Sequence, residues 1–279
     1  MRGIIGAVTD RLGAATAAAL PLGLILFADV VRWARPHVLV LLVLGFAVLA
    51  VRRSELRWLW AAAIPIAVWL AWRILTAPLA HPGGLDCADA ASPPAVWRLA
   101  QALLALGSLA ILMGILGARP AMFWVRRPAR PIVRLSIMGF AVAGPLGLVL
   151  GALIARPYFR TFEINLGDPG ALVPGMIFSL SNGIAEELIY RGAFMAFAGR
   201  VIGLRWALLL QAVVFGLAHS GAQFLGSPVP VVIAIGIGGY VAGLLVLKTR
   251  SLLLPIAVHV AVDLPIYAYF ACRNPIPIP

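Results

Sequence analysis

Long apolar runs follow one another along almost the whole chain, and they limit its possible folds more than any other feature. They lie at about residues 14–31, 37–51, 58–76, 96–117, 135–155, 172–197, 204–220, 228–247 and 251–271. A membrane-spanning helix needs about 20 such residues. Only 11% of the residues are charged, whereas about a quarter are charged in a soluble domain. The sequence therefore predicts an all-α, polytopic membrane helical bundle with about 8–9 transmembrane helices.

The cationic residues lie in short links between these runs. The net charge is +12, but no basic domain is present that could hold a duplex, so we expect no nucleic-acid partner. The strongest cluster lies at 118–134, whereas the link at 77–95 carries Asp86 and Asp89 and no Lys or Arg. Because cytoplasmic loops are rich in Lys and Arg, these charges predict a multi-pass protein of the cell (inner) membrane. Its N-terminus is expected in the cytoplasm.

Two further expectations follow from this topology. The chain has two cysteines, Cys87 and Cys272, which are too few for a disulfide framework. Both are expected on the non-cytoplasmic side of the membrane. Arg73 and Arg98 lie near the ends of apolar runs, where such side chains extend toward the interface.

A stiff basic linker divides the chain into two groups of helices. The linker "RRPARPIVR" contains Pro128 and Pro131. Residues 1–131 are expected to form an accessory group of about four spans, and residues 132–279 the helical core. Every ionisable cluster inside an apolar run lies in the second group.

The stretch "SNGIAEELIYRGAF" places three charged residues inside an apolar run, Glu186, Glu187 and Arg191. Each such residue costs about 2.5 to 3.5 kcal/mol at the centre of a membrane helix. Glu187 and Arg191 are four residues apart, so they share a helix face and can pair. Glu186 is rotated by about 100° from Glu187. One carboxylate is therefore expected to be structural and the other free to react.

Two later runs carry further polar residues at helical spacing. Phe215 and His219 lie four apart in "FGLAHSG", and His259 and Asp263 lie four apart in "HVAVD". If the helices pack together, two glutamates, two histidines and an aspartate converge. Ionisable residues inside a membrane indicate a functional site.

These motifs resemble those of the CPBP family of CAAX proteases and bacteriocin-processing intramembrane glutamic endopeptidases. The family pattern is EExxxR, FxxxH and HxxxN, and the similarity covers about residues 172–270. The resemblance implies a peptidase without metal or other cofactor, in which Glu186 activates water with help from His219. It implies that His259 and Asp263 stabilise the oxyanion and that Glu187 and Arg191 support the site. Asp263 departs from the usual Asn. It can donate its own O–H to the oxyanion if it is protonated, or orient the His259 ring if it is ionised, and we favour the second arrangement.

The chemistry is consistent with these residue types. Amide hydrolysis needs a base within hydrogen-bond reach of water, and desolvation makes a carboxylate a stronger base. The predicted substrate is a membrane-associated or exported protein, cut at a leader peptide or a C-terminal sorting tail. A metal site built from the same residues, a proton-coupled transporter and a non-catalytic scaffold or immunity protein remain alternatives.

Overall fold

The computed structural model describes residues 19, 20, 23, 36–52, 57–76, 93–125, 128–155, 172–220 and 229–267. All regular structure in these residues is helical, with no strand, as the sequence predicts. Most of the first apolar run and of the link at 77–95, and both Cys87 and Cys272, lie outside the described residues.

The described helices follow the predicted apolar runs closely. The helices of the N-terminal group are α2 (Pro36–Arg52), α3 (Arg57–Thr76) and α4 (Pro93–Ile115). Those of the C-terminal group are α5 (Arg130–Ala155), α6 (Leu172–Glu186), α7 (Met195–Ile202), α8 (Leu204–Leu217), α9 (Val229–Thr249) and α10 (Leu253–Ile266). A π-helical segment, Glu187–Phe194, joins α6 to α7 without a break. Gly203, with φ of 81°, makes the turn between α7 and α8.

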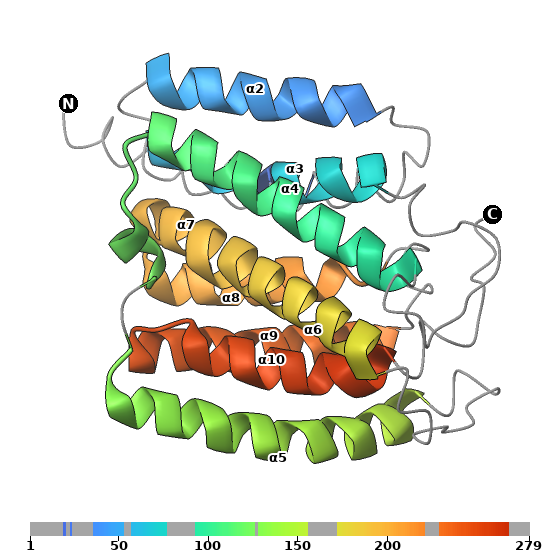
Figure 1. The fold of residues 1–279 in the computed structure, drawn as a ribbon. Coiled ribbons are helices and arrows are strands. Elements are labelled where there is room, and N and C mark those ends of the chain that lie inside the picture. Colours follow the sequence, from blue (N-terminus) through green and yellow to red (C-terminus); the bar gives the residue numbers. More distant parts are fainter. Residues whose placement is uncertain are drawn as a thin grey trace.

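The helices run side by side in one bundle (Figure 1). Here α10 packs between α5 and α6, and α8 packs on α7 and α9. The N-terminal helices pack directly on the C-terminal ones, because α4 contacts α6, and α3 contacts both α7 and the π-helical segment. Helices of both groups therefore pack against α6 and the π-helical segment, which carry Glu186 and Glu187.

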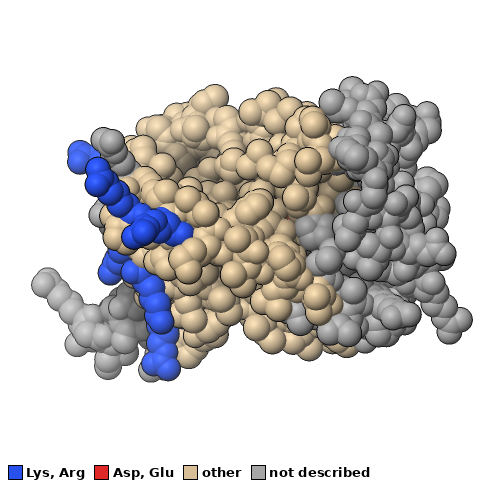
Figure 2. Space-filling view, turned by 60° about the horizontal axis from the view of Figure 1, so that its bottom comes forward, with Lys and Arg blue, Asp and Glu red and all other residues tan. Residues whose placement is uncertain are grey.

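The Lys and Arg side chains that Figure 2 shows on the surface lie at one end of the bundle, whereas Arg73, Arg98 and Arg191 are buried. The end of α2 and the start of α3, and likewise α4 and α5, α7 and α8, and α9 and α10, meet at that same end of the bundle (Figure 1). A basic end is the charge asymmetry that the positive-inside rule describes.

The outer surface carries large apolar side chains. Leu103 and Ile111 of α4 and Ile137 of α5 are more than 60% exposed. By length and composition, two of the described helices can cross a membrane, at Ala95–Ile115 and Val229–Thr249. Shorter apolar helices lie beside them, such as Trp60–Thr76 and Leu204–Leu217. An extensive exposed apolar surface of this kind is typical of contact with lipid or a partner.

The interior, by contrast, contains charged side chains. Glu186, Glu187 and Arg191 are each only 1% exposed. The prediction that Arg73 and Arg98 reach toward the interface is wrong, since their exposed fractions are 6% and 4%. The physical reason is that both side chains turn inward, and Arg98 lies against aromatic rings of α3, α4 and α6.

Candidate active site

The two glutamates lie where the chain changes from α-helix to π-helix. Glu186 is the last residue of α6, with φ of −66° and ψ of −40°, and Glu187 is the first residue of the π-helical segment. A π-helical turn is wider than an α-helical one. Such turns are rare overall, but those that occur are often found at functional sites. The change of helix type therefore occurs between the two carboxylates.

Glu187 is held by two cationic or hydrogen-bonding partners. Its Oε1 atom lies 3.0 Å from Nη1 of Arg191 and accepts a hydrogen bond of 2.8 Å from Nδ1 of His259. The predicted pair of Glu187 and Arg191 is thus present. The guanidinium of Arg191 also lies over the ring of Phe215, 3.9 Å from its centroid. These contacts compensate for the burial of both charges.

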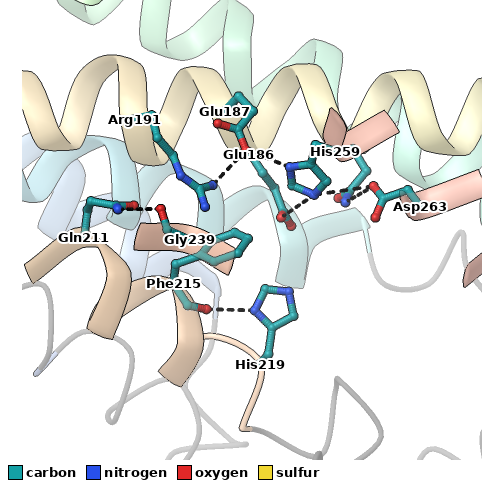
Figure 3. A network of polar contacts seen from close by, with 10 residues as sticks. Glu186, Glu187, Arg191, Gln211, Phe215, His219, Gly239, His259 and Asp263 are labelled. Carbon is teal, nitrogen blue, oxygen red and sulfur yellow. Dashed lines mark hydrogen bonds and ion pairs between the residues drawn. The ribbon is translucent and has the colours of Figure 1, made fainter. Parts of the chain in front are cut away.

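His259 lies among three carboxylates (Figure 3). Nδ1 of His259 faces Glu187, so Nε2 lies between the other two carboxylates. It is 3.6 Å from Oε2 of Glu186 and 3.6 Å from Oδ2 of Asp263. Both distances exceed the usual range for a hydrogen bond. The ring orientation is therefore set by Glu187, and the hypothesis that Asp263 orients the ring does not describe this geometry.

Asp263 is instead held by a residue that the sequence-based interpretation missed. Nδ2 of Asn182 donates a hydrogen bond of 2.7 Å to Oδ2 of Asp263. Asn182 lies one helical turn before Glu186 in the same motif, and this i, i+4 spacing was the signal that could have identified it.

His219 lies at the other side of the site, just beyond the C-terminal end of α8. Its Nδ1 atom lies 2.8 Å from the backbone carbonyl oxygen of Phe215. A carbonyl oxygen only accepts, so Nδ1 carries the proton and Nε2 is the acceptor in the neutral ring. The ring of Phe215 lies 4.9 Å from the His219 ring and 6.1 Å from the His259 ring. In Figure 3 the carboxylate of Glu186 points toward the side on which His219 lies.

A second missed residue fixes α8 against α9. Nε2 of Gln211 donates a hydrogen bond of 2.8 Å to the carbonyl oxygen of Gly239. A Cβ atom at Gly239 would lie 3.0 Å from the Phe215 ring and 3.1 Å from Nη2 of Arg191. The absent side chain therefore leaves room for both groups. Gln211 lies one turn before Phe215, so helical spacing was again the available signal.

The six predicted site residues thus occupy one region of the bundle, and five of them are linked directly. Glu187 contacts Arg191 and His259, and His259 lies within 3.6 Å of Glu186 and Asp263. His219 reaches the group through Phe215. Within the described residues, no group of three or more His, Cys, Asp or Glu side chains is arranged to hold a metal ion.

Comparison with known proteins identifies one family. Residues 168–265 match the family model described as type II CAAX prenyl endopeptidase Rce1-like. The match covers α6 to α10 and every predicted site residue, and it confirms the family that the sequence motifs indicate. The members of this family are membrane-bound CAAX proteases. Neither the curated proteins nor the solved structures gave a match.

Proposed function

We propose that this chain, with residues 168–265 as a member of the Rce1-like family, is a metal-independent intramembrane glutamic endopeptidase. Its substrate is a membrane-associated or exported protein, cut at a leader peptide or a C-terminal sorting tail. Residues 132–279 form the catalytic core, and residues 1–131 support it. The chain crosses the cell membrane eight or nine times with its N-terminus in the cytoplasm, an arrangement supported by the basic end of the bundle and its apolar outer surface.

The main support for this proposal is the burial and the missing hydrogen bond of the Glu186 carboxylate. Its side chain is 1% exposed, and its Oε2 atom has no hydrogen-bond partner among the described residues. Oε2 of Glu187 also lacks a hydrogen-bond partner, but Oε1 of Glu187 is held by Arg191 and His259. A buried polar atom without a partner costs about 1–3 kcal/mol. A catalytic water or a substrate group bonded to Oε2 would remove that cost, which suits a general base.

The surrounding groups supply the rest of the chemistry. Glu186 takes a proton from the water that attacks the scissile carbonyl carbon, and Nε2 of His219 accepts a hydrogen bond from the same water. His259 donates Nδ1–H to Glu187, so its imidazolium form has Nε2–H available for the oxyanion. Glu186 then returns its proton to the leaving amine as the peptide bond breaks. Glu187 supplies the counter-charge of the imidazolium at 2.8 Å.

The test compares two substitutions at adjacent residues. Glu186→Gln should abolish proteolysis while the protein keeps its thermal stability, because no described hydrogen bond holds Oε2 of Glu186 and its contact with Nε2 of His259 is long, at 3.6 Å. Glu187→Gln should lower both activity and the melting temperature, because Arg191 and His259 lose a charged partner. The loss of a buried charge partner costs about 3–5 kcal/mol. The measurements are thermal unfolding in detergent and quantitative profiling of protein termini in membranes of cells that produce each variant.

Two outcomes would contradict the proposal. Full activity of Glu186→Gln would exclude Glu186 as the base. Loss of wild-type activity in the presence of EDTA or phenanthroline would indicate a metal enzyme built from the same residues.

A further inference from the structure

An amide and a carboxylate on neighbouring helices meet beside the site. Asn182 of α6 is 7% exposed and Asp263 of α10 is 6% exposed, and the hydrogen bond from Nδ2 of Asn182 to Oδ2 of Asp263 measures 2.7 Å. An ionised carboxylate only accepts, so the amide nitrogen has to face it. Oδ1 of Asn182 is then buried without a hydrogen-bond partner among the described residues. The bond to Asp263 therefore fixes the Asn182 side chain.

The packing of α6 on α10 brings these two side chains together. Gly183 directly follows Asn182, and a Cβ atom at Gly183 would lie 2.9 Å from Cγ2 of Val260 and 3.3 Å from its backbone nitrogen. The same Cβ atom would lie 3.6 Å from Cβ of His259. The two helices approach this closely because residue 183 lacks a side chain, and the approach places Asn182 beside the turn of α10 that carries His259 and Asp263.

One oxygen atom of Asp263 faces two possible donors. Oδ2 accepts the hydrogen bond from Asn182 and also lies 3.6 Å from Nε2 of His259. A bonded pair of imidazolium and carboxylate has an N···O distance of about 2.7–2.9 Å. Asp263 therefore stops short of His259, although the two residues lie one turn apart on the same helix. Among the described residues, Asn182 is the hydrogen-bond donor that holds the carboxylate in this position.

The gap between Asp263 and His259 matters for the chemistry of the site. An N–H group that is already bonded to a carboxylate is not free to bond to an oxyanion, and the carboxylate would occupy the place where negative charge develops. Oε2 of Glu186 also lies 3.6 Å from Nε2 of His259 and is not bonded to it. Nε2 of His259 thus has negative charge on two sides but no hydrogen bond to either carboxylate.

We propose that Asn182 is a positioning residue, which holds the Asp263 carboxylate away from Nε2 of His259 and keeps the N–H group of this nitrogen available to the substrate. The inference rests on the proposed function for its catalytic meaning, whereas the restraint on Asp263 does not depend on it. Asp263 then provides a counter-charge at a distance without capturing the donor.

The restraint can be measured without activity. The purified full-length protein, labelled with ¹⁵N-histidine and placed in liposomes, is studied by solid-state NMR at a pH where both ring nitrogens of His259 carry protons. The chain has four histidines, and the spectrum of His259→Gln assigns the signals of His259. In Asn182→Ala the Nε2 proton of His259 should move to lower field, because Asp263 is released and forms a short, charge-assisted bond with it. In Asn182→Ala/Asp263→Asn this movement should be largely reversed.

Kinetics distinguish this role from a purely structural one. Asn182→Ala should lose about 10²-fold in kcat with little change in KM, because a donor to the transition state is blocked. Asn182→Ala/Asp263→Asn should be about tenfold more active than Asn182→Ala, because an amide binds the imidazolium less strongly than a carboxylate. If Asn182 only supported the fold, the second substitution would restore nothing. The substrate for these assays is a peptide identified by the terminal profiles of the wild-type protein.

A matched control removes another buried polar group from α6. Ser179 is fully buried, and its Oγ atom has no hydrogen-bond partner among the described residues, so Ser179→Ala should leave the His259 signal and kcat unchanged. An unmoved His259 signal in Asn182→Ala would overturn the inference. Asn182→Leu, which also lacks a donor, decides the question if Asn182→Ala does not fold. A moved signal together with an unchanged kcat would instead refute the proposed role of His259 as the oxyanion donor.

Discussion

At the scale of single residues, Asp263 shows how one departure from a family pattern is accommodated. An asparagine would offer N–H donors to an oxyanion, whereas an ionised aspartate offers only acceptors. Here Asn182 donates to Asp263, and Nε2 of His259 lies 3.6 Å away. We therefore expect Asp263 to act through His259, as a counter-charge close to the nitrogen that faces the oxyanion.

This role predicts different effects for two substitutions. Asp263→Asn should keep measurable activity but change the pH–rate profile, because the imidazolium of His259 loses a negative charge that lies 3.6 Å from its Nε2 atom. Asp263→Ala should also release Asn182 and lose about 10²-fold in kcat/KM. The pH–rate profiles of both variants measure these effects. Near-wild-type rates for Asp263→Ala at every pH would remove the residue from the site.

The contacts within one helix could be predicted from the sequence, but those between helices could not. Helical spacing is sufficient to predict that Glu187 meets Arg191. The bonds of Glu187 to His259 and of Asn182 to Asp263 join residues 72 and 81 positions apart, and they depend on how α6 and α10 pack. The burial of Arg98 was missed for the same reason, because nearness to the end of an apolar run does not reveal which way a side chain turns.

At the scale of elements, the close approach of α8 and α9 holds one side of the site. Gly216 follows Phe215, and Gly236 of α9 faces it. A Cβ atom at Gly216 would lie 2.8 Å from the carbonyl oxygen of Val232 and 3.1 Å from Cα of Gly236. Backbone atoms cannot move aside as a flexible side chain can, so the two helices approach this closely only because residue 216 lacks a side chain.

Gly216→Ala should therefore destabilise the protein by about 1–3 kcal/mol, because α8 must move away from α9. The activity should also fall, because Phe215 and His219 would move together with α8. Thermal unfolding in detergent measures the loss. Gly107→Ala in α4 is the matched control, since no atom lies within 4 Å of the added Cβ and alanine favours a helix. Equal melting temperatures for the two variants would contradict the close packing.

The boundaries of the elements were largely predictable, but the π-helical segment was not. Helices in an apolar environment consist mostly of apolar residues, so apolar runs mark their positions. The ends of α3 and α8 lie close to the ends of the predicted runs. The sequence near Glu187 fits an α-helical period. The wider turn arises where the chain packs against α3, α8 and α9, so its cause lies in tertiary structure.

At the scale of the whole molecule, the basic end predicts an orientation in the membrane that the two cysteines can test. With nine spans, Cys87 and Cys272 should both lie on the non-cytoplasmic side. A membrane-impermeant thiol reagent applied to intact cells should then modify both. Modification of one cysteine alone, when both react in opened membranes, would require a different number of spans.

The contact between Glu187 and His259 also has a consequence for the order of biosynthesis. The ribosome makes α6 and the π-helical segment well before α10, so the nascent chain holds its two glutamates in place before His259 and Asp263 exist. Glu187 has Arg191 within its own helix from the start. Glu186 gains its described ion-pair neighbour, Nε2 of His259, only when α10 is made. A polypeptide interrupted before α10 therefore lacks the imidazole that lies closest to the Glu186 carboxylate and that also bonds to Glu187.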